Sequence, residues 1–135
     1  MTHQQATSVV AAPIRTVESR VRDVLGWPRF MLGVEQVTEI SFGRYRFVVR
    51  NGSRTRTVDV AVTAHPREHR IVWCALNGPR FDGELRLAEV DADHTRVRLT
   101  LRVEPLGLLA GLADMVSGSA DAATIDLRRL DDLVA

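Results

Sequence analysis

The stretch RYRFVVRNGSRTRTVDVAVTA, residues 44 to 64, holds two runs of alternating apolar and polar residues on either side of Asn51-Gly52. Successive side chains of a strand point to opposite faces, so each run predicts a strand with one apolar and one solvated face. Asn-Gly tolerates the positive φ angles of a tight type I′ turn, which predicts an antiparallel hairpin. The apolar positions of the two strands are Tyr45, Phe47, Val49, Val58, Val60 and Val62.

Similar runs extend the sheet on both sides of this hairpin. Turn signals at HPREHR, at Asn77-Gly78-Pro79 and at DADH separate these runs. The run IVWCAL is apolar at every position, which is typical of a strand covered on both faces and predicts a buried, inert Cys74. The further strands are expected at residues 8–12, 34–42, 71–76, 81–90 and 95–105.

Two helical patterns flank the strands. Residues 14–25 carry apolar side chains at three- and four-residue spacing after Pro13, and Gly26 and Pro28 are expected to end this helix before the aromatic corner WPRF. Residues 108–135 form one long pattern with an apolar stripe, and this is the only element long enough to cover the sheet. The expected fold class is therefore α+β: a seven-stranded antiparallel curved sheet around a long C-terminal helix, with short helices after the first strand.

Length and composition limit the function classes. The 135 residues suit a single domain over 1–135, with residues 1–7 loosely ordered. No apolar run is long enough to span a bilayer and no signal peptide is evident, so we expect a cytoplasmic protein without integral membrane association. The net charge of +1 argues against nucleic acid as a partner, and the absence of lysine excludes Schiff-base chemistry.

The segment HPREH, residues 65 to 69, formally matches the H-x-x-E-H pattern of a zinc peptidase group. That chemistry needs both histidines on one face of a stable helix, whereas Pro66 and the strand-like flanks favour a hairpin loop. We therefore expect no metal and no other cofactor.

Several of these signals occur together in one order: WPRF after the first helix, HPREHRIVW, NGPRFDGELRL, TRVRLTLRVEPLG and a long final helix. In this order the chain resembles the polyketide cyclase/dehydrase branch of the START-like (SRPBCC, birch-pollen-allergen-like) superfamily, from about Ser8 to the C-terminus. The resemblance implies a helix-grip fold with a hydrophobic cavity between sheet and helix. It also implies binding of a polyketide, a lipid or a quinone, or cyclisation of a polyketide chain.

The residues themselves leave the cavity open to two interpretations. Small residues crowd the middle of the last helix, which favours either unfilled volume opposite the sheet or a helix packed closely against it. Alternation along the strands and the helical stripe gives the expected ligand-binding residues. They are Trp27, Phe30, Tyr45, Phe47, Trp73, Leu112, Met115 and Ser119.

Three functions fit these residues. A cyclase needs hydrogen-bond donors that polarise a ketone, and Tyr45 and Arg80 are the two candidates for this catalytic role. The related aromatase/cyclases tend to carry ionisable or hydroxyl residues just after the WP corner, where this chain has Leu32-Gly33. That difference argues against their catalytic apparatus, and the lack of an evident buried base favours a non-enzymatic carrier or chaperone for a hydrophobic small molecule. The third function is an interaction module with a filled cavity, which binds a partner helix or forms a homodimer.

Overall fold

The computed structural model describes residues 2–31, 33–51, 54–78, 80–103 and 122–134. Its helical elements are the α-helix α1 (Ile14–Arg22), the 3-10 helices η1 (Val24–Arg29) and η2 (Pro66–Glu68), and the α-helix α3 (Ala122–Val134). Its strands are β1 (Thr2–Val10), β2 (Val34–Ser41), β3 (Arg44–Asn51), β4 (Arg54–His65), β5 (Arg70–Ala75), β6 (Phe81–Asp91) and β7 (His94–Val103).

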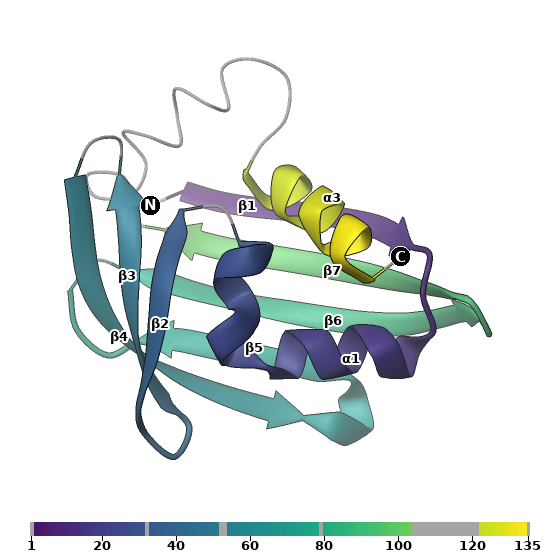
Figure 1. Cartoon of the computed structure of the whole chain (residues 1–135), viewed down its shortest axis with the longest axis horizontal. Coiled ribbons are helices and arrows are strands. Elements are labelled where there is room, and N and C mark those ends of the chain that lie inside the picture. The colour runs from purple at the N-terminus through teal and green to yellow at the C-terminus, as the bar shows by residue number, and fades with distance from the viewer. Residues whose placement is uncertain (1, 32, 52–53, 79, 104–121, 135) are drawn as a thin grey trace.

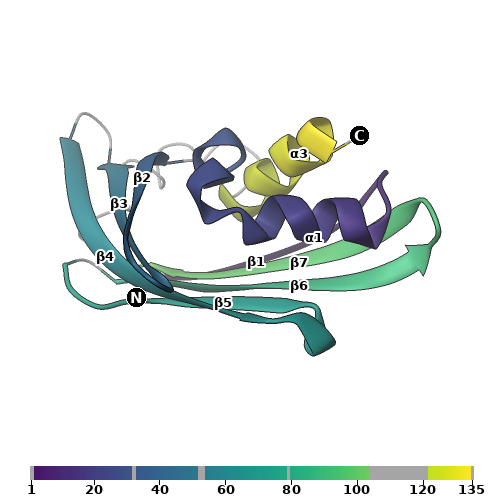
Figure 2. The ribbon, with the colours of Figure 1, turned by 60° about the horizontal axis from the view of Figure 1, so that its bottom comes forward.

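The seven strands form one antiparallel sheet in the order β1-β7-β6-β5-β4-β3-β2, as the alternating runs predict. The predicted antiparallel hairpin of residues 44–64 is confirmed, with Tyr45 opposite Val60 and Phe47 opposite Val58. The sheet curves strongly, so that β2, β3 and β4 rise at one end of the molecule (Figures 1 and 2). A curved sheet of this kind has a concave face, which holds the core, and a convex face open to solvent.

Three helical elements cover the concave face: α1 crosses it near β6, η1 packs against β2, and α3 lies along β1 and β7 (Figure 2). The helix α1 buries Val17 and Val21, which lie four residues apart on one side of it. It ends at Arg22, with Asp23 as the first residue beyond it, and not at Leu25 as predicted, because the chain turns there into a 3-10 helix that includes Pro28. The short helices α1 and η1 thus cover the concave face together with α3, and the last helix does not cover it alone.

The described part of α3 is fixed to the rest of the fold by both apolar and polar contacts. Leu127 and Leu130 are buried in the core, in agreement with the predicted apolar stripe. The Arg129 guanidinium donates to the backbone carbonyls of Pro28 and Arg29, at 3.4 and 3.2 Å, and the Asp131 carboxylate accepts from the amide of Ala11. Residues 108–121 of the expected long helix lie outside the described residues.

The N-terminal residues differ from expectation. Residues 1–7 were expected to be loosely ordered and the first strand to span 8–12, yet β1 begins at Thr2 and pairs in register with β7, from Thr2 opposite Val103 to Val10 opposite Thr95. The polar run THQQATS gives no apolar alternation, and the ladder of backbone hydrogen bonds to β7 supplies the order instead.

The expectation of a buried Cys74 was also wrong, because its side chain is exposed. Only Ile71 and Trp73 of β5 are buried, and the alternate positions face the open convex side of the sheet. A run that is apolar at every position therefore marks a strand covered on one face here, not on both.

The HPREH segment forms the turn between β4 and β5, as expected. Its central residues make a single 3-10 turn, and His69 follows with a φ angle of 51°. The two histidines therefore do not share a helix face, and no cluster of three potential metal-ligating side chains occurs in the described ranges.

Candidate functional site

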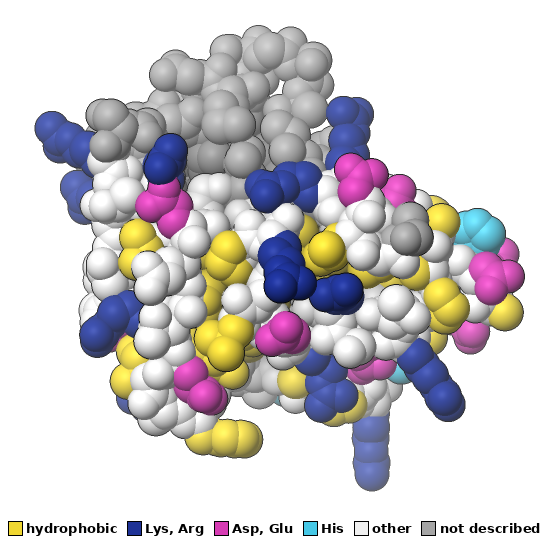
Figure 3. Space-filling model, viewed as in Figure 1, with side chains coloured by type: hydrophobic (Ala, Val, Ile, Leu, Met, Phe, Trp, Pro, Cys, Tyr) yellow, Lys and Arg dark blue, Asp and Glu magenta, His cyan; other side chains and the backbone are white. Residues whose placement is uncertain are grey.

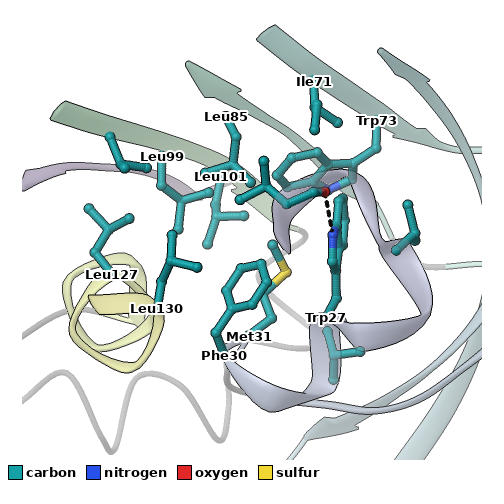
Figure 4. Close-up of a cluster of buried hydrophobic side chains, with 14 of the residues drawn as sticks. Trp27, Phe30, Met31, Ile71, Trp73, Leu85, Leu99, Leu101, Leu127 and Leu130 are labelled. Carbon is teal, nitrogen blue, oxygen red and sulfur yellow. Dashed lines mark hydrogen bonds between the residues drawn. The ribbon is translucent and has the colours of Figure 1, made fainter. Parts of the chain in front are cut away.

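An aromatic cluster fills the centre of the concave face. The ring centroid of Trp27 lies 4.8 Å from that of Trp73, 5.7 Å from that of Phe47 and 6.4 Å from that of Phe30. Phe81 closes the cluster at 5.7 Å from Phe47. The edge-to-face and tilted arrangements are the ones that aromatic pairs prefer. The helix η1 thus places Trp27 on the concave face of the sheet, with its ring beside that of Trp73 (Figure 4).

The two indole groups of this cluster differ in hydrogen bonding. Trp27 Nε1 donates to the carbonyl of Val21 at 2.9 Å (Figure 4), which ties the corner to α1. Trp73 Nε1 is buried without a hydrogen-bond partner. Because an unpaired buried donor costs free energy, the Trp73 indole is the polar group of the cluster with unused bonding capacity.

A groove of about 620 Å³ lies between the end of α1, the strand β4 and the tip of the β2–β3 hairpin. We call it the concave groove. Apolar side chains show in the hollow between β2 and η1 in the space-filling view (Figure 3). Its size is within the range of small-molecule sites. The groove is lined by Arg22, Val24, Glu39, Phe42, Gly43, Arg44, Tyr45, Ala61, Val62, Thr63, Ala64 and Ile71.

Strand periodicity explains why the groove adjoins the cluster. Tyr45 lies two residues before Phe47 on β3, and Ile71 lies two residues before Trp73 on β5, so each pair shares one face. Ala64 of β4 stands opposite Ile71 in the sheet. On the other side, Val24 enters from η1 because α1 stops at Asp23. The groove therefore lies between the curved strands and the break between the two helices.

Tyr45 is the half-buried polar group at the centre of this arrangement, and it is the single tyrosine of the chain. Burial raises the pKa of its phenol, and the carboxylates of Glu39 and Asp23 raise that pKa further because they oppose a second negative charge. At neutral pH the hydroxyl is therefore protonated. It can donate a hydrogen bond to a carbonyl oxygen in the groove, and it is poorly suited to act as a base.

The remaining polar candidates lie elsewhere. Asp59 is on the outer face of the sheet; its carboxylate accepts from Arg46 Nε at 2.9 Å and from the Asn77 amide at 3.0 Å, and these bonds lower the pKa of its carboxyl. Arg80 lies on the β5–β6 turn with its Nε 3.8 Å from Asp82, and it lines a separate hollow. The structure thus does not bring Arg80 and Tyr45 to one cavity.

The predicted ligand-binding residues fall into three groups. Trp27, Phe30, Phe47 and Trp73 are all buried and pack against one another or against their neighbours in the cluster. Tyr45 lines the groove itself. Leu112, Met115 and Ser119 lie outside the described residues, as does most of the stripe of small residues that suggested a cavity.

Most groove residues were missed from the sequence. Ile71 and Val62 could have been found, because they share a strand face with Trp73 and Tyr45 respectively. Val24 and Arg22 had no such signal, because their position depends on where α1 ends. Glu39 stands opposite Tyr45 in the β2–β3 ladder, a register that irregular pairing between Glu39 and Ser41 obscures.

A second hollow, of about 470 Å³, lies on the convex face beside Cys74. Its side chains are mostly polar, and Asp82 there already accepts from the amide of Ala75 at 2.8 Å. Its apolar side chains, those of Val72, Trp73 and Cys74, are fewer than those that line the concave groove, so the concave groove is the better candidate.

The comparison with protein families agrees with this geometry. The family described as "Polyketide cyclase / dehydrase and lipid transport" matches residues 1–135, the whole chain. The protein belongs to this polyketide cyclase/dehydrase and lipid transport family. The resemblance in the sequence and the seven-stranded sheet gripping a C-terminal helix are thereby confirmed.

Solved structures share this fold at low sequence identity. The Zhui aromatase/cyclase from Streptomyces sp. R1128 superimposes with a TM-score of 0.75 at 23% identity, over 98% of this chain and 93% of the other. A START superfamily protein from Mycobacterium smegmatis gives a TM-score of 0.76 at 18% identity, over 98% and 96% of the two chains.

Among curated proteins, an uncharacterized 17.2 kDa protein of Streptomyces lincolnensis is 21% identical over 126 residues, which cover 93% of this chain and 84% of that protein. These likenesses show the fold and leave the ligand open. Within the described residues, no helix is long and apolar enough to cross a membrane.

Proposed function

We propose that this protein binds a hydrophobic small molecule, a polyketide, a lipid or a quinone, in the concave groove. The observation that carries the proposal is the half-buried Tyr45 in a groove with apolar walls, on the same strand face as Phe47 of the aromatic cluster. Val24, Val62 and Ile71 would contact the apolar body of the ligand, and the Tyr45 hydroxyl would donate a hydrogen bond to a carbonyl or hydroxyl oxygen. Membership of the family supports this chemistry.

Carriage without turnover fits the groove better than cyclisation does. Deprotonating a carbon between two carbonyls requires a positioned base, and a raised pKa makes the Tyr45 phenol a donor at neutral pH. Among the described residues Glu39 is the carboxylate that lines the groove, and its side chain is exposed to water instead of being enclosed beside a bound ligand. We therefore propose a carrier, with conversion of the ligand as the outcome that would identify a cyclase instead.

Filling the groove should abolish binding while leaving the fold intact. Ala64 is exposed, lines the groove and stands opposite Ile71, so Ala64→Trp places an indole in the space that the ligand would use. We expect the affinity for decylubiquinone, measured by isothermal titration calorimetry, to fall at least about tenfold, since the lost apolar contact exceeds about 1.4 kcal/mol. This quinone has a fully substituted ring, so it does not add to the exposed Cys74 thiol.

The matched control is Ala88→Trp. Ala88 is also an exposed alanine in a strand, but it lies in β6 opposite Arg96 and away from the groove. It should bind decylubiquinone as the unmodified protein does. Equal loss of affinity in both variants, or none in Ala64→Trp, would contradict the proposed site. Native mass spectrometry after incubation with an apolar cell extract then distinguishes retention of an unchanged molecule from its conversion.

A further inference from the structure

The tip of the β2–β3 hairpin presents a large aromatic side chain to solvent. Phe42 is 101% exposed, more than the other large apolar side chains of the described residues, and the turn at its side is made by Gly43 with a φ angle of 75°. Ile40 in the same hairpin is 46% exposed. Such a residue contributes nothing to packing of this chain, so its apolar surface is available to something outside it.

This tip forms the rim of the concave groove. Phe42, Gly43 and Arg44 line the groove at its outer end, and Arg22 at the end of α1 lines it as well. The guanidinium groups of Arg22 and Arg44 thus line the same groove as the phenyl ring, together with the carboxylate of Glu39, and the Asp23 carboxylate lies close enough to act on the phenol of Tyr45. An arginine can extend its polar head while its aliphatic stem stays against apolar groups, which suits the boundary between lipid tails and headgroups.

We propose that the β2–β3 tip docks the protein on the surface of a lipid bilayer, with Phe42 in the interfacial region and Arg22 and Arg44 facing headgroup phosphates. In this orientation the mouth of the groove opens onto the membrane. Docking itself depends only on the tip. A role for docking in loading an apolar ligand from the bilayer rests on the proposed function.

The shape of the tip favours a bilayer over a protein partner. A stable protein interface buries about 1,200–2,000 Å² over a broad and complementary surface. A narrow hairpin with a single protruding ring offers much less, whereas insertion of an aromatic side chain at a membrane interface needs no complementary pocket. Figure 3 shows apolar atoms projecting from the lower end of the molecule, where Figure 1 places this hairpin.

Sedimentation with large unilamellar vesicles tests the proposal. The unmodified protein should bind vesicles of phosphatidylcholine and phosphatidylglycerol, and Phe42→Ser should lower the partition coefficient about tenfold, because it removes the inserted ring. Arg44→Ser should lower it about fivefold on the anionic vesicles and leave binding to pure phosphatidylcholine unchanged.

Val90→Ser is the matched control. Val90 is 46% exposed and lies beside the β6–β7 turn, at the opposite end of the sheet (Figure 1). It should sediment as the unmodified protein does. Circular dichroism should report the same fold for all variants, since Phe42, Arg44 and Val90 are exposed.

Three results would overturn docking: no sedimentation of the unmodified protein, equal sedimentation of Phe42→Ser, or conversion of a dimer to a monomer by Phe42→Ser without any effect on vesicles. The Ala64→Trp variant separates this proposal from the proposed function. It should still dock on vesicles while it fails to bind decylubiquinone. If the unmodified protein bound decylubiquinone but did not sediment with vesicles, only the docking proposal would be overturned.

Discussion

Replacing Trp27 with alanine is expected to lower the free energy of unfolding by about 4 kcal/mol. Trp27 is fully buried and its ring contacts those of Phe30, Phe47 and Trp73, so truncation opens a large cavity at the centre of the concave face. The Val21 carbonyl also loses its indole donor, which adds about 1 kcal/mol to the lost packing and is included in that total. Urea denaturation followed by circular dichroism measures the change as a shift of the midpoint at constant slope.

The control for this prediction lies in the same 3-10 helix. Leu25 is 53% exposed, so Leu25→Ala removes a side chain of similar chemistry without opening a cavity and should cost less than about 1 kcal/mol. If the two variants were equally stable, the packing of Trp27 between η1 and the sheet would not be a major source of stability.

Gly83→Ala is expected to lower the free energy of unfolding by about 2–3 kcal/mol. Gly83 in β6 stands opposite Trp73 in β5, and the indole lies across it. A Cβ atom at this position would overlap the Cζ2 and Cε2 atoms of Trp73 and would lie 2.8 Å from the Thr100 carbonyl oxygen. Alanine normally gains about 0.5–1 kcal/mol over glycine in a strand interior, but this gain is smaller than the cost of the overlap.

A double variant identifies the cause. In Trp73→Leu the indole is gone, so adding Gly83→Ala to it should cost less than the same change costs in the unmodified protein. The cost of Gly83→Ala should fall only in part in this background, because the Thr100 carbonyl oxygen belongs to the backbone and remains close to the new Cβ atom. Both steps are measured by urea denaturation. An unchanged cost in the double variant would mean that Trp73 does not lie across Gly83.

Local patterns in the sequence predicted most of the sheet. The alternation around Tyr45 and Val60 and the turn signals between runs identified the seven strands, because period-two patterning and turn chemistry depend on neighbouring residues only. The first strand was mislocated because its order comes from pairing with β7, about ninety residues away, and not from its own composition.

Side-chain position was harder to predict than strand position. Cys74 and Trp73 are neighbours in one apolar run, and only the missing cover on the convex face decides that the first is exposed and the second buried. In the same way, Tyr45 was recognised from its strand face, but the groove around it depends on Asp23 ending α1 and on the curvature of the sheet. These are properties of tertiary packing, which overrides local patterns.

The titration of Tyr45 tests the central claim most directly, because the chain has no other tyrosine. With tyrosine labelled by 13C at Cζ, the protein gives one resonance whose position follows ionisation of this phenol. In the free protein the pKa should lie above the ordinary value of about 10, owing to burial and the carboxylates of Glu39 and Asp23.

Saturation with decylubiquinone should shift this resonance and raise the pKa further, because the ligand excludes water from the groove and accepts a hydrogen bond from the neutral phenol. The Ala64→Trp variant should show neither change on addition of the quinone. If calorimetry shows decylubiquinone bound to the unmodified protein while the Tyr45 resonance and its titration stay unchanged, the ligand does not occupy the concave groove and the account is contradicted.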